Sequence, residues 1–221
     1  MCNSGFESNH QGKYMRHGSQ PEGPPAIPGK SILSPYFAAG FAFSTGQFVA
    51  DVPYDPHLPM IFQGEEISMT VRGYTHGYDF YTPARSVCFH YYAIGENRAK
   101  RKKVKTFWEH SGDHAGSGKR SMNRLLGVIR MDPDLVEGVD YDGSGLDRYG
   151  LGSLREPEAF YEMFGIDVAG KRAAGGLCKF VASGNMQRRF GERLVKGDGG
   201  MDGPVDYDAI GKYRIPALEW D

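Results

Sequence analysis

Three prolines within seven residues, in PYDPHLP (53–59), constrain the fold of this chain more than any other feature. Proline fixes φ and donates no backbone hydrogen bond, so this segment must be a turn rather than a helix or a central strand. The turn sets where the next element begins, in IFQGEEISM. From Gly64 to about Gly73, apolar side chains recur at helical spacing, which predicts a helix. Glu65 and Glu66 then fall in its first turn.

The spacing of apolar residues, and the Gly, Pro and capping residues that end elements, predict the remaining helices and strands of an α/β fold. Strands are expected at 36–43, 78–82 and 86–92, sharing one mixed sheet, with a short helix running from Ser44 to Ala50. Further helices are expected in KRSMNRLLGVI (119–129) and in EPEAFYEMFG, the latter with Pro157 at N1 and Gly165 at C′.

The segments around these elements divide the chain into three regions. Residues 1–35 contain PEGPPAIPG and are predicted to be a loop or a poorly ordered N-terminal segment. Residues 36–95 form the predicted core. Residues 96–221 are expected to be a loop-rich extension packing on that core, with 132–155 especially rich in Asp and Gly and no strong periodicity after 166.

Composition narrows the class of protein. With 221 residues and 40% hydrophobic residues, the chain is long enough for one globular domain and shows no membrane-spanning run. The start lacks the pattern of a secretory signal, so a cytoplasmic protein is expected. Three widely spaced cysteines make a disulfide framework unexpected. A net charge of −1 gives no reason to expect a nucleic-acid partner.

Glu65 and Glu66 have two explanations. Acidic residues in a first turn complement the helix dipole, by roughly 0.3–1 kcal/mol each. Alternatively, carboxylates at a helix start that face a cleft accept hydrogen bonds from sugar or acceptor hydroxyls. Gly64 before them permits close approach of a backbone or a ligand. Their position in the sequence is compatible with both.

His90, in SVCFHYY, also has two explanations. A histidine in a strand is more often a core or edge residue, yet imidazole is a common ligand of divalent metals. Cys88 lies two residues away, but no further ligand is close in sequence. The Asp-x-Asp triplets at 132–134, 140–142 and 206–208 are weak metal signals. The basic run 98–105 is compatible with a nuclear signal, a diphosphate-binding segment or a solvated face, and the last is the usual explanation.

The segments FSTGQF, VPYDP, GEEISM, THGYDFYTP and FHY together resemble the second half of a GT-A nucleotide-sugar glycosyltransferase. More narrowly, they are similar to the polypeptide α-N-acetylglucosaminyltransferases that act on hydroxyproline of a cytoplasmic ubiquitin-ligase subunit. The strong likeness covers roughly residues 36–92.

The resemblance implies a reaction and a site. The reaction is transfer of N-acetylglucosamine from UDP-N-acetylglucosamine to a protein hydroxyl (hydroxyproline or Ser/Thr), with retention and a divalent ion, Mn²⁺ or Mg²⁺. One of the two glutamates would face the reaction centre, and the other would support it or the helix terminus. The implied residues are Glu65 and Glu66 as catalytic, Gly40, Phe41, Ser44 and Gly64 as substrate-binding, and His90 as metal ligand.

Such enzymes place a nucleotide-binding half with an Asp-x-Asp pair before this region, whereas only about 35 residues precede it here. The chain is therefore expected to be a fragment whose metal-binding Asp-x-Asp lies upstream, and to be inactive alone. The alternative function is a non-catalytic remnant or acceptor-binding module. A nucleic-acid binder rests only on the basic run.

Overall fold

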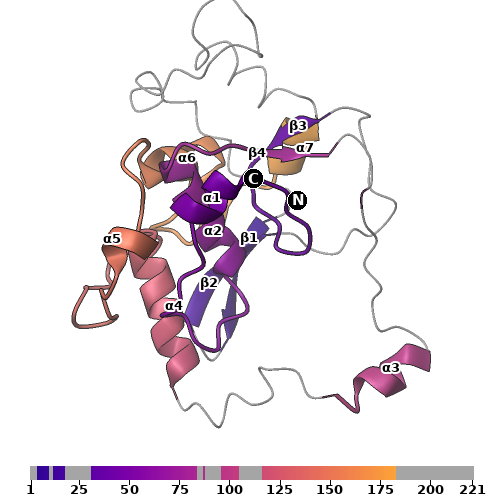
Figure 1. The fold of residues 1–221 in the computed structure, drawn as a ribbon, viewed down its shortest axis with the longest axis horizontal. Coiled ribbons are helices and arrows are strands. Elements are labelled where there is room, and N and C mark those ends of the chain that lie inside the picture. The colour runs from indigo at the N-terminus through magenta and orange to yellow at the C-terminus, as the bar shows by residue number, and fades with distance from the viewer. Residues whose placement is uncertain are drawn as a thin grey trace, which may run out of the picture.

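The computed structural model describes residues 4–9, 12–17, 31–83, 87, 96–104 and 116–182. Strands and helices alternate irregularly along them (Figure 1): β1 Ser4–Asn9, β2 Gly12–His17, β3 Ile32–Ser34, α1 Gly46–Asp51, α2 Glu65–Thr75, β4 Phe80–Thr82, α3 Glu96–Arg101, α4 Ser117–Val128, α5 Leu146–Tyr149, α6 Pro157–Met163, β5 Ile166–Asp167, β6 Arg172–Ala173 and α7 Leu177–Ala182. The predicted α/β class is confirmed. The boundaries of the three predicted regions stay a prediction.

Helix α2 lies at the centre of the packed elements (Figure 1) and contacts α6, α4 and β2. Its predicted inner face is confirmed: Ile67, Val71 and Tyr74 are 1%, 0% and 6% exposed. These positions share one side of a helix, so the spacing in the sequence sufficed to identify them. They join a core completed by side chains of β2, α4, α6 and α7.

The strands form three two-stranded antiparallel sheets within the described part of the chain, pairing β1 with β2, β3 with β4, and β5 with β6. Strand β4 confirms the strand expected at 78–82, but its partner is β3, from the region predicted to be loop. No single mixed sheet joins the described strands, so that part of the prediction was wrong. The strand expected at 86–92 falls outside the described residues, except for Val87.

Residues 36–43, predicted as a strand, form none. The backbone N–H of Phe37 donates to Thr70 Oγ1 at 2.9 Å, and that of Ala39 donates to Glu66 Oε1 at 2.8 Å. Side chains of α2 therefore take the donors that a strand ladder would need. The apolar run is buried only at its start, since Phe37 is 8% exposed whereas Phe41 and Phe43 are 45% and 94% exposed.

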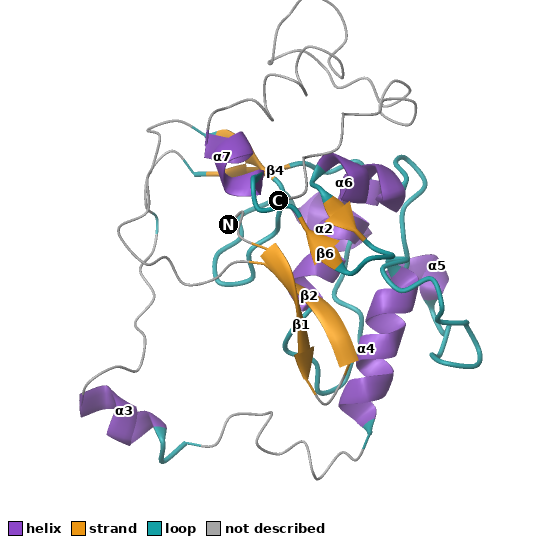
Figure 2. Cartoon of the chain, turned by 180° about the vertical axis from the view of Figure 1, so that it is seen from behind, coloured by secondary structure: helices purple, strands orange, loops and turns teal. Residues whose placement is uncertain are grey.

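The N-terminal region contains strands where the sequence predicted a loop. Strands β1 and β2 pair with Phe6 opposite Met15. Figure 2 shows this pair of strands beside α4, and β2 contacts both α2 and α4. Tyr14 and Met15 are 4% and 0% exposed. Adjacent strand residues point to opposite faces, so both faces of β2 are covered and no alternating pattern marked it.

The three predicted helices beyond α2 are confirmed. Helix α1 begins at Gly46, slightly later than expected, with Thr45 rather than Ser44 at the N-cap. Helix α4 covers most of the predicted 119–129 segment. Helix α6 begins at Pro157, and Gly165 follows its C-cap with φ 63°, the C′ conformation that glycine favours.

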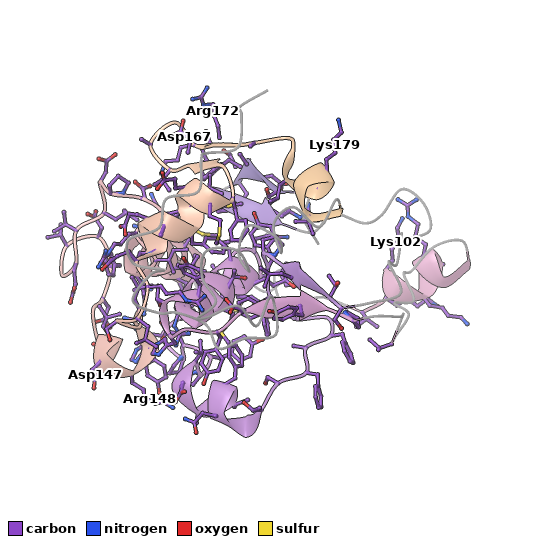
Figure 3. All side chains as sticks on the ribbon, turned by 90° about the horizontal axis from the view of Figure 1, so that it is seen from above. Lys102, Asp147, Arg148, Asp167, Arg172 and Lys179 are labelled. Atoms are coloured by element: carbon purple, nitrogen blue, oxygen red, sulfur yellow. The ribbon has the colours of Figure 1, made fainter. Side chains whose placement is uncertain are left out.

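The C-terminal part contains short elements that the sequence did not reveal. Helix α5 interrupts the loop expected at 132–155. Strands β5 and β6 form a hairpin in which Arg172 and Asp167 pair at 2.8 Å, at the edge of the molecule in Figure 3. Cys178 in α7 is disulfide-bonded. The chain therefore carries a disulfide, contrary to the expectation from cysteine number and spacing.

Helix α3 carries part of the basic run and stands apart from the packed elements in Figures 1 and 2. Lys102, just after it, lies far from the core side chains in Figure 3. This placement agrees with a solvated face. Within the described ranges, every helix is too short or too polar to cross a membrane.

Gly64 occupies the N-cap of α2 with φ 94° and ψ −16°, in the left-handed region. A Cβ there would lie 3.2 Å from Leu125 Cδ1. We expect Gly64→Ala to lower the free energy of unfolding by about 1–3 kcal/mol, measured by urea denaturation. Gly46→Ala is the matched control because a Cβ at Gly46 meets nothing within 4 Å, and it should be neutral or stabilising. Equal losses in both variants would contradict the prediction.

Candidate active site

The N-terminus of α2 borders a pocket of about 300 Å³, here named the Gly40 pocket. Three segments build it: β2, the loop after Phe37, and the turn that leads into α2. Its lining is Met15, Arg16, Ala39, Gly40, Phe62, Gln63, Gly64, Glu65, Glu66 and Ile67. Segments far apart in the sequence thus meet around the two glutamates.

Glu66 is anchored. Its Oε1 accepts the Ala39 N–H at 2.8 Å, which ties the wall of the Gly40 pocket to α2. Burial raises the pKa of Glu66, while the Ala39 N–H and the positive charge of Arg16 oppose that rise. This carboxylate therefore already has a structural task.

Glu65 differs from its neighbour. Its Oε2 is buried and has no hydrogen-bond partner among the described residues. Burial, and secondly the charge of Glu66, raise the pKa of Glu65 to about 7. Burial, followed by the charges of Glu65 and Glu66, also raises the pKa of Tyr54. At neutral pH the Glu65 carboxyl can thus both accept and give a proton, and no described residue occupies its inner oxygen.

Glu65 also lines a second pocket, of about 240 Å³, here named the Tyr54 pocket. One wall is α2 and the other is the proline-rich turn. Its lining is Tyr54, Asp55, Leu58, Ile61, Glu65, Ser68, Met69 and Arg72. Glu65 is the residue that the two pockets share.

Arg72 forms the buried end of the Tyr54 pocket. It is 1% exposed, and burial lowers its pKa to about 10, although Asp55 opposes that shift. Its Nε donates to Gly150 O at 3.2 Å and its Nη1 to Pro53 O at 2.8 Å. Its Nη2 has no partner among the described residues.

Asp55 is held by Arg124. Arg124 Nε donates to Asp55 Oδ2 at 2.8 Å, and the two side chains are 2% and 4% exposed. Arg124 also donates to the carbonyls of Asp142 and Ser144. This buried ion pair holds the proline-rich turn beside α2.

Exposed aromatic side chains flank both pockets. Tyr54 and Phe62, one in each lining, are 57% and 53% exposed. Phe41 and Phe43, in the loop that leaves Gly40, are 45% and 94% exposed. Aromatic rings with one open face offer flat apolar area to a ligand.

The structure brings four predicted site residues together around the Gly40 pocket: Gly40, Gly64, Glu65 and Glu66. Phe41 and Ser44 lie further along the same loop, outside that lining. His90 lies outside the described residues. Sequence reasoning missed Arg16, Tyr54, Phe62 and Arg72. Only Arg72 carried a signal, because it lies seven positions after Glu65 on the same face of α2.

A metal site needs several converging ligands. In the described ranges, no group of three or more His, Cys, Asp or Glu side chains could hold a metal ion. The described residues therefore offer no site for the expected divalent ion, and the predicted ligand His90 lies outside them.

The raised pKa of Glu65 predicts a dependence of stability on pH. Its ordinary value is 4.5 and its folded value is about 7. Between these values the folded chain keeps a proton that the unfolded chain has lost, so this contribution to stability falls as pH rises. We expect Glu65→Gln to raise the free energy of unfolding over wild type more at pH 8 than at pH 5, in urea titrations. An equal difference at both pH values would contradict this.

The α/β fold therefore places a carboxyl oxygen that is buried and without a partner among the described residues on a side chain that lines two pockets. A family model described as Glycosyltransferase (GlcNAc) matches residues 1–170, and the chain belongs to this glycosyltransferase family. Membership implies a sugar donor and an acceptor. No curated protein and no solved structure gives a significant match. The match begins before residue 36 and ends after 92, so it extends well beyond the segments whose likeness was evident.

Proposed function

We propose that this protein transfers N-acetylglucosamine from UDP-N-acetylglucosamine to a protein hydroxyl, hydroxyproline or Ser/Thr, with retention of configuration. The observation that carries the proposal is Glu65: its inner oxygen is buried, without a partner among the described residues, and its side chain lines both pockets. Family membership supplies the class of reaction.

The two glutamates then have different tasks. Glu66 positions the loop around Gly40 through the Ala39 N–H, at 2.8 Å. Glu65 faces the reacting groups, where its carboxyl hydrogen-bonds a hydroxyl of the sugar or the acceptor and exchanges a proton with it near neutral pH. Gly40, where a Cβ would meet nothing within 4 Å, leaves room for the donor sugar, and Gly64 lines the same pocket. The proposed reaction needs no covalent nucleophile from the protein.

The outer aromatic residues suit the acceptor side. Phe62 borders the Gly40 pocket and Tyr54 the other, each more than half exposed. An extended peptide that crosses the N-terminus of α2 would contact both rings. A divalent ion with His90 as one ligand is likewise part of the proposal, as is a cytoplasmic location.

A second function competes with the first: an acceptor-binding module without transfer chemistry. It is favoured by one observation, the lack of a converging metal-ligand group among the described residues. Such a module would use the same aromatic rings and the same Glu65.

The deciding experiment measures UDP release and peptide binding side by side. Residues 1–221, and in parallel the product of the complete gene, are incubated with UDP-N-acetylglucosamine, Mn²⁺ and a hydroxyproline peptide. Peptide-dependent UDP release with an α-linked product by NMR supports the transferase. Peptide binding without UDP release supports the module. A chain and gene product that do neither overturn both.

A further inference from the structure

In the function proposed so far, the Tyr54 pocket contributes only Glu65 and the outer ring of Tyr54, and its interior has no role. Along α2, Glu65, Ser68 and Arg72 follow one another at intervals of three and four residues and line the pocket together. The facing wall contributes Leu58 and Ile61 from the proline-rich turn. One helix face thus presents a carboxyl group, a hydroxyl and a guanidinium to a partly apolar space.

Two residues of this lining each carry a buried polar atom that lacks a partner within the described residues: Nη2 of Arg72 and Oε2 of Glu65. Leaving a buried donor or acceptor unpaired costs about 1–3 kcal/mol, and more for charged groups. Arg72 cannot turn away to solve this, because its Nε and Nη1 are held by the carbonyls of Gly150 and Pro53. A ligand that supplied both partners would recover the cost.

The neighbouring carboxyl groups disfavour an anion, which is the usual ligand of an arginine. A phosphate or carboxylate in this pocket would face Glu65 and Asp55 as well as Arg72. Asp55 is itself already paired with Arg124. A suitable ligand group needs one hydrogen-bond acceptor for Arg72 and one donor for Glu65. Its flanks should be apolar, to contact Leu58 and Ile61.

We infer that the Tyr54 pocket binds a secondary amide, whose carbonyl oxygen accepts from Arg72 Nη2 and whose N–H donates to Glu65 Oε2, while the second carboxyl oxygen of Glu65 serves the reacting hydroxyl. The inference rests on the proposed function, because that function involves two sources of a secondary amide. One is the acetamido group of the transferred sugar, and the other is a backbone amide of the acceptor peptide. The pocket, at about 240 Å³, is far larger than the roughly 30 Å³ share of a water molecule.

The test is ligand-observed NMR on the full chain with three probes: N-acetylglucosamine, glucose, and the blocked amide N-acetylglycine N-methylamide. If the sugar is the source, N-acetylglucosamine binds about tenfold more tightly than glucose, the value of one charge-assisted hydrogen bond. If the peptide is the source, the blocked amide binds and the two sugars do not differ. Either result supports the inference.

The matched variants are Ser68→Met, which fills the pocket from its buried wall, and Val49→Met, which adds the same side chain at a position 63% exposed. Ser68 is changed rather than Arg72 because Arg72 also holds two backbone carbonyls. Ser68→Met should abolish the preference and Val49→Met should keep it. If Ser68→Met does not fold, Ser68→Val replaces it.

Two results would overturn the inference. The first is that wild type shows no amide-dependent binding, which would leave buried water as the partner of Arg72 Nη2 and Glu65 Oε2. The second is that Ser68→Met leaves binding unchanged. Both readouts are independent of transfer. If the chain binds amides but never releases UDP, the amide site is supported and the proposed transferase function is contradicted. If the chain releases UDP but binds no amide, the transferase function is supported and the amide site is contradicted.

Discussion

Arg124→Met should lower the free energy of unfolding by about 3–5 kcal/mol, because it leaves a buried carboxylate without its partner. Asp55 and Arg124 are 4% and 2% exposed and lie 2.8 Å apart. The guanidinium also accounts for hydrogen bonds to the carbonyls of Asp142 and Ser144, which would be lost together. Urea denaturation followed by circular dichroism measures the change.

The control is the same substitution at an exposed ion pair. Arg130 pairs with Glu156 and Glu158, and all three side chains are more than half exposed. Arg130→Met should therefore cost less than about 1 kcal/mol. A second check is the double variant Arg124→Met with Asp55→Leu, which should regain part of the loss because the unpaired charge is gone. Similar costs for the two arginines would show that burial of the Asp55 pair is not what stabilises the turn.

Glu65→Gln should reduce the rate of transfer by about 100-fold, because an amide cannot exchange the proton that a carboxyl with a pKa near 7 exchanges. Glu66→Gln should reduce it less than tenfold, since an amide oxygen can still accept the Ala39 N–H that Glu66 Oε1 now accepts. The measurement is kcat for UDP release with the hydroxyproline peptide, in whichever polypeptide of the deciding experiment turns over.

The difference in rate between Glu65→Gln and Glu66→Gln tests whether the two glutamates have different roles. Above the pKa of Glu65, which is about 7, both variants remove a negative charge from neighbouring positions of the same helix turn, so effects on the helix dipole are alike there. Equal losses in rate would assign both residues to the helix terminus. A larger loss in Glu66→Gln would reverse the roles proposed for the two carboxylates.

Much of the site's framework could be read from local sequence. The spacing of Ile67, Val71 and Tyr74 predicted helix α2 and its buried face. The glycine before Glu65 and Glu66 placed both at its start. Pro157 and Gly165 likewise predicted the two ends of α6. Each of these features depends on residues within a few positions of one another, so the chain's own periodicity and end signals suffice.

The N-terminal strands and the loop after Tyr36 could not be read in this way. In β2 both faces are buried, so the alternation that identifies a half-buried strand is missing. Around Phe37 the apolar run resembled a strand, but its amide protons go to Thr70 and Glu66, about thirty residues later. A hydrogen-bond partner so distant leaves no trace in local composition.

The difference between Glu65 and Glu66 has the same origin. The two residues are adjacent in the sequence and chemically identical. Either one could be explained by the helix dipole or by contact with a ligand. Their environments diverge because Ala39 reaches one carboxylate and no described residue reaches the inner oxygen of the other. The free donor of Arg72 likewise depends on Pro53 and Gly150 occupying the rest of its guanidinium. Local spacing placed these side chains on one helix, whereas long-range contacts, which no local pattern encodes, left two of their polar atoms without protein partners among the described residues.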